Sequence, residues 1–111
     1  MAKIYKNDKD FLIIELDKEE LIKLNFGPIC DNCNTLIENK HFYVCCVNRC
    51  MCEDCLDDFI DNMKHYTDNA SIEYEIIHFN YVMRALEQDE RAMRTPNGKL
   101  TIYKEGQFDT D

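Results

Sequence analysis

Four of the seven cysteines stand in two pairs with the spacing of metal ligands. Cys30 and Cys33 form one C-x2-C pair, and Cys52 and Cys55 form the second. In each pair the two intervening residues let the backbone turn back, so that both sulfurs point to one centre. Zinc binds four such thiolates tetrahedrally, and a complete sulfur shell leaves no ligand position for water or substrate. The spacing therefore predicts one structural Zn²⁺ bound by these four cysteines.

Disulfides and an iron–sulfur cluster are the alternatives for the two pairs. An odd number of cysteines and an N-terminus without a hydrophobic secretion segment both disfavour disulfides. Iron–sulfur clusters also use four cysteines, but their usual spacings are tighter than these. Within the second pair, Cys50 could replace Cys52 as a ligand, because only Met51 separates them.

Three cysteines lie outside the two pairs, namely Cys45, Cys46 and Cys50. A second metal site would need further ligands from the histidines, which are His41, His65 and His78. No regular ligand spacing supports such a site, so we interpret the three cysteines as small buried residues on hairpin strands. A redox switch at adjacent Cys45 and Cys46 would need a lowered thiol pKa, which acidic neighbours oppose.

The charge of the chain restricts the kind of partner. With 22 acidic and 13 basic residues the formal net charge is -9. Proteins that bind nucleic acid by neutralising phosphates need a basic surface, so we expect a protein partner with a basic surface and no direct nucleic-acid binding. No apolar run is long enough to cross a bilayer, so we expect no membrane association and a cytoplasmic location.

The elements that must position the cysteine pairs begin with a strand and a helix in residues 1–27. Residues 1–10 are polar and are predicted to form a loose end. Residues 11–16 are apolar and rich in β-branched side chains, which predicts a buried strand. Asp17 and Glu20 have the spacing of a capping box, which starts a helix that we expect Gly27 to end.

Residues 28–66 contain the cysteine pairs and are predicted to form a knuckle, a hairpin and a helix. Asn34 follows the first pair, where asparagine tolerates a left-handed conformation. The polar residues 38–40 predict a hairpin turn between residues 36–37 and residues 41–44. Beyond Cys55 the apolar residues recur at helical spacing, at Leu56, Phe59, Ile60 and Met63. The second pair is thus predicted to lie at the start of a helix.

In this order of knuckle, hairpin and helix, the segment resembles treble-clef zinc fingers, and in particular the first zinc site of LIM-type and ZZ-type modules. The resemblance covers about a quarter of the chain and rests on the four paired cysteines. It implies a single-zinc core and a role in protein interaction. LIM, ZZ and RING modules have a second ligand set that this chain lacks, so ubiquitin-ligase activity is not carried over. The segment also resembles small phage-encoded proteins.

A longer helix is predicted for residues 69–93. Apolar residues alternate there at steps of four and three, at Ile72, Ile76, Phe79, Met83 and Leu86. We expect this seam to pack on its own domain, and a homodimer through the Ile72–Leu86 seam is the alternative. A strand from Ile72 to Ile76 is the competing structural interpretation, because apolar and glutamate residues alternate there. The aromatic residues Tyr74, Phe79 and Tyr81 could line a peptide groove or belong to the core.

The last segment, residues 94–111, is predicted to contain a turn, a short strand and an acidic tail. Thr95–Gly98 has the composition of a turn. Leu100–Tyr103 is predicted to be a strand that could pair with residues 11–16. Together these segments predict one α+β domain spanning residues 1–111, in which a treble-clef core carries an N-terminal strand and helix and a longer C-terminal helix.

The functional expectation follows from the closed metal site, the acidity and the lack of catalytic motifs. The sequence contains no P-loop, dinucleotide-binding fingerprint, nucleophile elbow or zinc-protease helix, so we expect no enzymatic activity. We therefore predict a zinc-stabilised acidic protein-interaction module. It could be a phage or mobile-element protein that inhibits a nucleic-acid-binding host machine by charge mimicry in the host cytoplasm. The alternatives are a dimeric zinc-finger regulator that binds nucleic acid, and a thiol redox or metal-relay protein.

Overall fold

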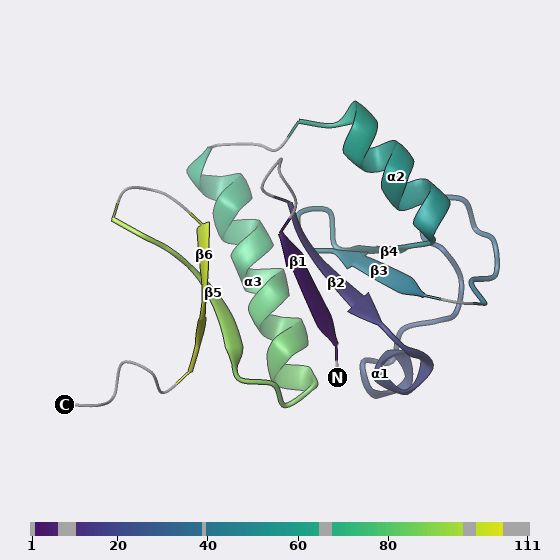
Figure 1. Cartoon of the computed structure of the whole chain (residues 1–111), viewed down its shortest axis with the longest axis horizontal. Helices are drawn as coiled ribbons and strands as arrows, with labels where there is room; N and C mark the ends of the chain where they lie inside the picture. Colours follow the sequence, from purple (N-terminus) through teal and green to yellow (C-terminus); the bar gives the residue numbers. More distant parts are fainter. Residues whose placement is uncertain (1, 7–10, 39, 65–67, 97–99, 106–111) are drawn as a thin grey trace.

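The computed structural model describes residues 2–6, 11–38, 40–64, 68–96 and 100–105. Its elements in chain order are β1 (Lys3–Lys6), β2 (Leu12–Leu16), α1 (Lys18–Lys23), β3 (His41–Val44), β4 (Arg49–Met51), α2 (Glu53–Asn62), α3 (Asn69–Ala85), β5 (Glu90–Arg94) and β6 (Leu100–Lys104) (Figure 1). This mixture of strands and helices agrees with the predicted α+β class. None of the helices in the described part of the chain has the length and apolarity needed to span a bilayer.

Strands β1 to β4 form an antiparallel sheet in the order β1-β2-β3-β4. The predicted strand in residues 11–16 is confirmed as β2. The prediction of a loose end in residues 1–10 is wrong for Lys3–Lys6, which pair with β2 as β1. Three of the four β1 residues are exposed, because β1 is an edge strand. Only Ile4 of this strand packs against the core, and a lysine stands at each end, so the sequence carries little apolar signal for a strand.

The two faces of the sheet are covered by different helices. On β2, Leu12, Ile14 and Leu16 belong to one core cluster, together with the apolar side chains of α3. Phe11 and Ile13 point to the opposite face and belong to a second cluster, which contains residues of α2 and of the first cysteine pair. Successive side chains of a strand alternate between faces, so β2 is buried on both sides.

The capping box at Asp17 and Glu20 is confirmed, since each side chain accepts a hydrogen bond from the other residue's backbone amide, both at 2.9 Å. The helix ends at Lys23 rather than at Gly27. Asn25 takes the left-handed conformation, with φ 59°, and the Phe26 amide donates to a carbonyl inside α1. Asparagine tolerates this conformation, so it ends the helix in the manner usually assigned to glycine.

Helix α3 (Asn69–Ala85) contains Ile72 and Ile76, so the competing interpretation of this segment as a strand is wrong. It ends at Ala85, however, and the predicted extension to residue 93 is wrong. Glu87 adopts φ 59° and closes the helix, and the chain continues as β5. The predicted seam packs inside this chain, because four of its residues are buried: Ile72, Phe79, Met83 and Leu86.

The predicted strand in residues 100–103 is confirmed as β6, but its partner is β5. Pairing with β2 is excluded because β1 and β3 occupy both edges of β2. The β5–β6 hairpin packs on α3, which lies between the hairpin and the sheet (Figure 1). Part of the predicted Thr95–Gly98 turn and the predicted tail from Gly106 lie outside the described residues.

The hairpin of the cysteine segment differs from the prediction. Strand β3 pairs with β4 through a turn at residues 45–48, in which Asn48 has φ 55°. Leu36 instead forms an isolated bridge with Ile29, so residues 36–37 are not a hairpin strand. Of the three cysteines predicted to be buried on hairpin strands, Cys50 is buried on β4. Cys45 is buried but lies in the turn, and Cys46 lies in the turn and is only partly buried, so the prediction is wrong in these respects.

Candidate metal centre

The sulfur atoms of the four paired cysteines converge on one point. All four lie within 4.8 Å of one another, and the Sγ atoms of Cys33 and Cys52 are 3.9 Å apart. A tetrahedron with Zn–S bonds of about 2.3 Å has S···S edges of about 3.8 Å. The seven cysteines are all free thiols, so no disulfide competes for these sulfurs. The group therefore has donors and dimensions that fit one tetrahedral metal ion.

The first pair lies on a tight knuckle before β3. The Cys30 amide donates to the Thr35 carbonyl at 2.9 Å, and the Asn34 amide donates to the Cys30 carbonyl at the same distance. Asn34 has φ 61°, which confirms the predicted left-handed residue. Because Ile29 and Leu36 bridge at the base of the knuckle, the two sulfurs of the pair are pointed to one side.

The second pair lies at the start of α2, as predicted. Cys52 is the N-cap of the helix, and Cys55 lies in its first turn. On the buried side of α2, Leu56 packs in the core cluster that also contains Cys30. The apolar face of α2 thus fixes the position of the second pair against the first.

Backbone amides support the sulfur of Cys30. The amides of Asn32 and Cys52 both donate to this sulfur, each at 3.4 Å, and Cys30 itself is fully buried. The bond from the Cys52 amide joins the two pairs directly, because Cys52 belongs to the second pair.

The thiols do not share the same tendency to ionise. The pKa of Cys33 is lowered to about 6, first by hydrogen bonding with the Thr35 side chain and then by the Thr35 backbone. At Cys55 the Asn32 side chain lowers the pKa, but desolvation and the other three thiols outweigh it and raise the pKa to about 12. Four neighbouring thiols cannot all ionise without a cation, and a bound divalent ion supplies the charge that compensates them.

Asp31 was not singled out by the sequence, yet it fastens the knuckle to the sheet. Its carboxylate accepts from the Cys50 amide at 2.9 Å, and its own amide donates to the Cys50 carbonyl at 2.8 Å. Cys50 is therefore a strand residue whose backbone holds the knuckle, and Cys52 rather than Cys50 joins the sulfur group. A carboxylate placed between two ligand cysteines was the signal for this contact.

The three remaining cysteines do not form a second centre. In the described part of the chain, the group of Cys30, Cys33, Cys52 and Cys55 is the one cluster with metal-ligand geometry. Burial raises the pKa of Cys45, and burial followed by a nearby carboxylate raises those of Cys46 and Cys50 to about 12. These values disfavour a reactive thiolate.

Two of the histidines can be placed, and neither joins the sulfur group. His41 is buried at the start of β3, opposite Leu16 of β2. His78 lies on α3, where its Nδ1 is 2.9 Å from the Tyr74 carbonyl oxygen. His65 lies outside the described residues. Neither described histidine is therefore placed to share a metal ion with the cysteine group.

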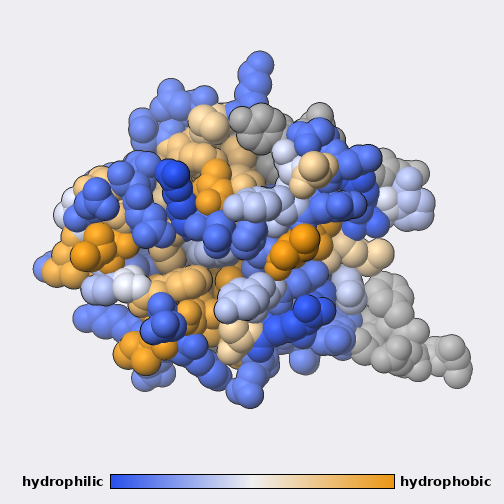
Figure 2. Space-filling view, turned by 180° about the vertical axis from the view of Figure 1, so that it is seen from behind, coloured by the Kyte–Doolittle hydropathy of each residue, from blue (hydrophilic) through white to orange (hydrophobic). Residues whose placement is uncertain are grey.

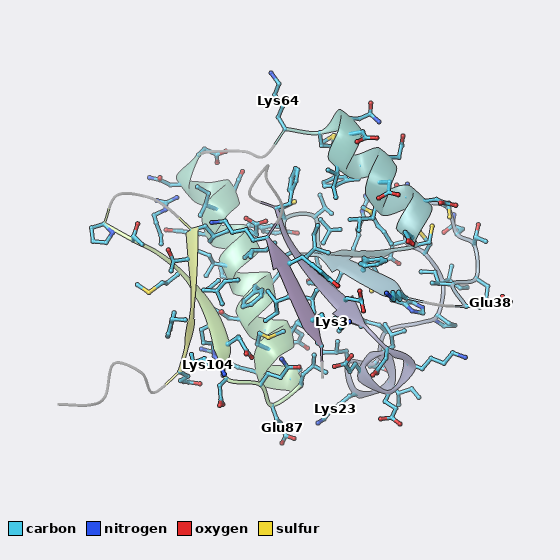
Figure 3. The ribbon with its side chains drawn as sticks, in the orientation of Figure 1. Lys3, Lys23, Glu38, Lys64, Glu87 and Lys104 are labelled. Atoms are coloured by element: carbon cyan, nitrogen blue, oxygen red, sulfur yellow. The ribbon has the colours of Figure 1, made fainter. Side chains whose placement is uncertain are left out.

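An open hollow of about 1000 Å³ borders the exposed side of the sulfur group. Its rim carries the acidic residues Glu38, Glu53 and Asp54, together with Lys40 and the apolar side chain of Leu36. Figure 3 shows Glu38 at the knuckle end of the molecule and Lys64 pointing outward beyond the far end of α2. The surface around the cysteines is therefore mainly acidic.

No family model, no curated protein and no solved structure matches this chain.

Proposed function

We propose that the cysteine group binds one structural Zn²⁺ and that residues 28–66 form a treble-clef finger. The all-sulfur donor set, the edge lengths of the group and the placement of one pair on a knuckle and the other at a helix start support this. Four thiolates complete the coordination of zinc and leave no position for a substrate or a reactive water. The proposed metal therefore stabilises the fold and does not catalyse a reaction.

Native mass spectrometry tests the metal proposal. The chain purified without added metal should carry one zinc, and Cys30→Ser should carry less than about a tenth of that amount. Cys46→Ser is the matched control, because Cys46 is outside the sulfur group, and it should keep the full zinc content. Zinc retained by Cys30→Ser, or iron in place of zinc, would contradict the proposal.

We further propose that the chain is a non-catalytic protein-interaction module that binds a basic partner through α2. The observation that carries this is the α2 acidic surface, which we define as the exposed carboxylates Glu53, Asp54, Asp57, Asp58 and Asp61. No lysine or arginine interrupts them within the helix. A zinc ion with four thiolates would add two negative charges at the start of the same helix.

Helix stability explains only part of this surface. Carboxylates in the first turn, such as Glu53 and Asp54, interact favourably with the helix dipole. Asp58 and Asp61 lie nearer the C-terminus, where the dipole disfavours negative charge by about 0.3–1 kcal/mol per residue. Since the last turn of α2 contains no basic residue, these charges oppose the helix rather than stabilise it. A basic partner gives them a favourable role.

One specific form of the proposal is an inhibitor encoded by a phage or mobile element. Its net charge of -9 would let it compete with nucleic acid for the basic surface of a host protein. The proposed partner is then a nucleic-acid-binding protein of the host, while the chain itself does not bind nucleic acid.

Affinity capture on the immobilised, zinc-loaded chain tests the partner class. We expect proteins captured from a bacterial lysate to have basic nucleic-acid-binding surfaces and to elute between roughly 0.1 and 0.5 M NaCl, because salt screens surface charges. Duplex DNA added to the lysate should compete with capture. Elution that does not depend on salt would contradict the charge argument.

A pair of matched variants distinguishes the contribution of the α2 acidic surface to binding from the contribution of total charge. The triple variant Asp57→Asn, Asp58→Asn and Asp61→Asn should lose the captured partner at about 0.15 M NaCl. The control triple Glu19→Gln, Glu87→Gln and Asp89→Asn removes the same charge from exposed positions elsewhere and should retain the partner. Equal loss from both triples would show that net charge, and not this surface, determines binding.

A further inference from the structure

Helix α3 has a second, solvent-facing side opposite its buried seam. Its residues are all exposed, and we call them the outer α3 face: Ala70, Glu73, Tyr74, Ile77, Tyr81 and Arg84. The large aliphatic side chain of Ile77 and the aromatic side chain of Tyr81 are each 63% exposed. Figure 2 shows hydrophobic side chains reaching the surface near the middle of the view, in the region of α3. The outer α3 face thus exposes one large aliphatic side chain, Ile77, together with the rings of Tyr74 and Tyr81.

The residues of the outer α3 face are arranged regularly around Ile77. With 3.6 residues per turn, Ala70 and Arg84 lie almost in line with Ile77, seven residues before and after it. Tyr74 and Tyr81 lie three and four residues from Ile77 on one flank of this line. Glu73 lies on the other flank, toward which Arg84 is also turned. The face therefore has aromatic residues on one side and a pair of opposite charges on the other.

We propose that the outer α3 face binds the same face of a second copy of this chain. In an antiparallel pair of α3 helices, a twofold axis near Ile77 keeps each flank on its own side and reverses the direction of the helix. The two Ile77 side chains then meet, and Tyr74 lies beside the partner's Tyr81. On the opposite flank Glu73 lies near the partner's Arg84, because their positions along the axis differ by only three residues, or about 4.5 Å.

The two charged residues of this face cannot pair within one chain, but they can pair between two copies. Glu73 and Arg84 are eleven residues apart, or about 16 Å along the helix, so they cannot pair within one chain. The twofold arrangement forms two Glu73–Arg84 pairs and two tyrosine contacts at once. This self-complementarity identifies a second copy as the partner despite the net charge of -9.

The proposed dimer differs from one through the Ile72–Leu86 seam, whose residues Phe79 and Met83 are fully buried in the chain. It also leaves α2 accessible, because α2 packs on the other face of the sheet. A dimer would thus present two α2 acidic surfaces to a partner, which raises avidity where both can engage. The dimer itself does not depend on the role that we propose for α2.

Sedimentation equilibrium of the full zinc-loaded chain at about 0.15 M NaCl tests the dimer. The chain should show a concentration-dependent monomer–dimer equilibrium. Ile77→Glu places a carboxylate at the centre of the interface and should leave only monomer. The control Ile22→Glu changes a more exposed isoleucine on α1, at 78% exposure, and should leave the equilibrium unchanged. A wild-type chain that stays monomeric to about 1 mM would overturn the proposal.

Charge reversal tests the twofold geometry. Glu73→Arg and Arg84→Glu should each raise the dimer dissociation constant about tenfold, because each places two like-charged pairs in the interface. The double variant restores both pairs with their signs exchanged and should return the constant to within about threefold of wild type. A double variant as weak as the single ones would overturn the antiparallel arrangement. Circular dichroism should show that every variant keeps its helix content.

Discussion

On one face of the four-stranded sheet, α3 packs on Leu12, Ile14 and Leu16 in the larger apolar core, to which β5 and β6 also contribute. On the other face, α2 and the knuckle pack in a smaller core, and three of the paired cysteines are only partly buried or exposed. A small core contributes little net stability, so a metal can supply what apolar burial does not. On the sheet face that α3 covers, by contrast, the described residues include no group with metal-ligand geometry.

This comparison predicts its largest effect for loss of the metal. Cys30→Ser, or chelation of the wild-type chain, should remove a binding free energy on the order of 10 kcal/mol and unfold the knuckle and α2. Amide hydrogen exchange should show lost protection in residues 28–37 and 53–62, while α3 stays protected. Equal loss of protection on both faces would show that the two cores unfold together as one unit. Cys46→Ser should exchange like the wild type.

On the sheet face that α3 covers, we expect the largest loss of stability when a buried apolar side chain is truncated. Phe79 is fully buried there, so Phe79→Ala should lower the free energy of unfolding by about 3–5 kcal/mol. Chemical denaturation of the zinc-loaded chain measures the change, and the zinc content should remain that of the wild type. Tyr81→Ala on the exposed side of the same helix should cost less than about 0.5 kcal/mol at protein concentrations where the chain is monomeric. A larger effect that appears only at higher concentrations would come from the dimer and not from the core.

A buried carboxylate offers a smaller test of the same face. Glu75 of α3 is fully buried and accepts a hydrogen bond from the Leu12 amide at 3.1 Å. Glu75→Ala removes this acceptor from a buried amide and should cost about 1–3 kcal/mol. Glu75→Gln keeps an acceptor oxygen and should cost less. If the two variants were equally unstable in urea, the hydrogen bond would not be the cause.

The smallest expected effect is at the start of α3. The Asp68 side chain accepts from the Ser71 amide at 3.0 Å and caps the helix, and Asp68→Ala should cost about 1 kcal/mol. Asp68→Ser keeps a capping oxygen and serves as the control. Thermal unfolding with zinc bound should show the loss for alanine alone. A change in zinc affinity would mean that the two faces are coupled.

Local signals were enough to predict several features of the cysteine segment and of α1. The knuckle needs two residues between cysteines and a left-handed residue after them, and Asn34 supplies that residue. The helix after Cys55 follows from the spacing of Leu56, Phe59 and Ile60. The Asp17 and Glu20 capping box involves residues only three apart. Each of these features depends on contacts between near neighbours in the chain.

Features that depend on distant contacts were missed or misplaced. Strand β1 has a lysine at each end, and it is defined by pairing with β2 and by the packing of Ile4 against the larger core. Helix α3 was extended too far, because Glu87 ends it in a left-handed conformation that glutamate rarely adopts. The partner of β6 depends on β1 and β3 having already occupied the edges of β2.

The sequence by itself determined which cysteines form pairs, where α1 and α2 begin, and that the chain is strongly acidic, because these properties depend on residue type and short spacing. Only the tertiary structure decided that the two pairs meet, that Asp31 fastens the knuckle to Cys50, and that α3 buries the Ile72–Leu86 seam while exposing Ile77. The physical reason is that burial and strand pairing depend on which segments compete for the same sheet. Contacts between near neighbours in the chain do not determine the outcome of that competition.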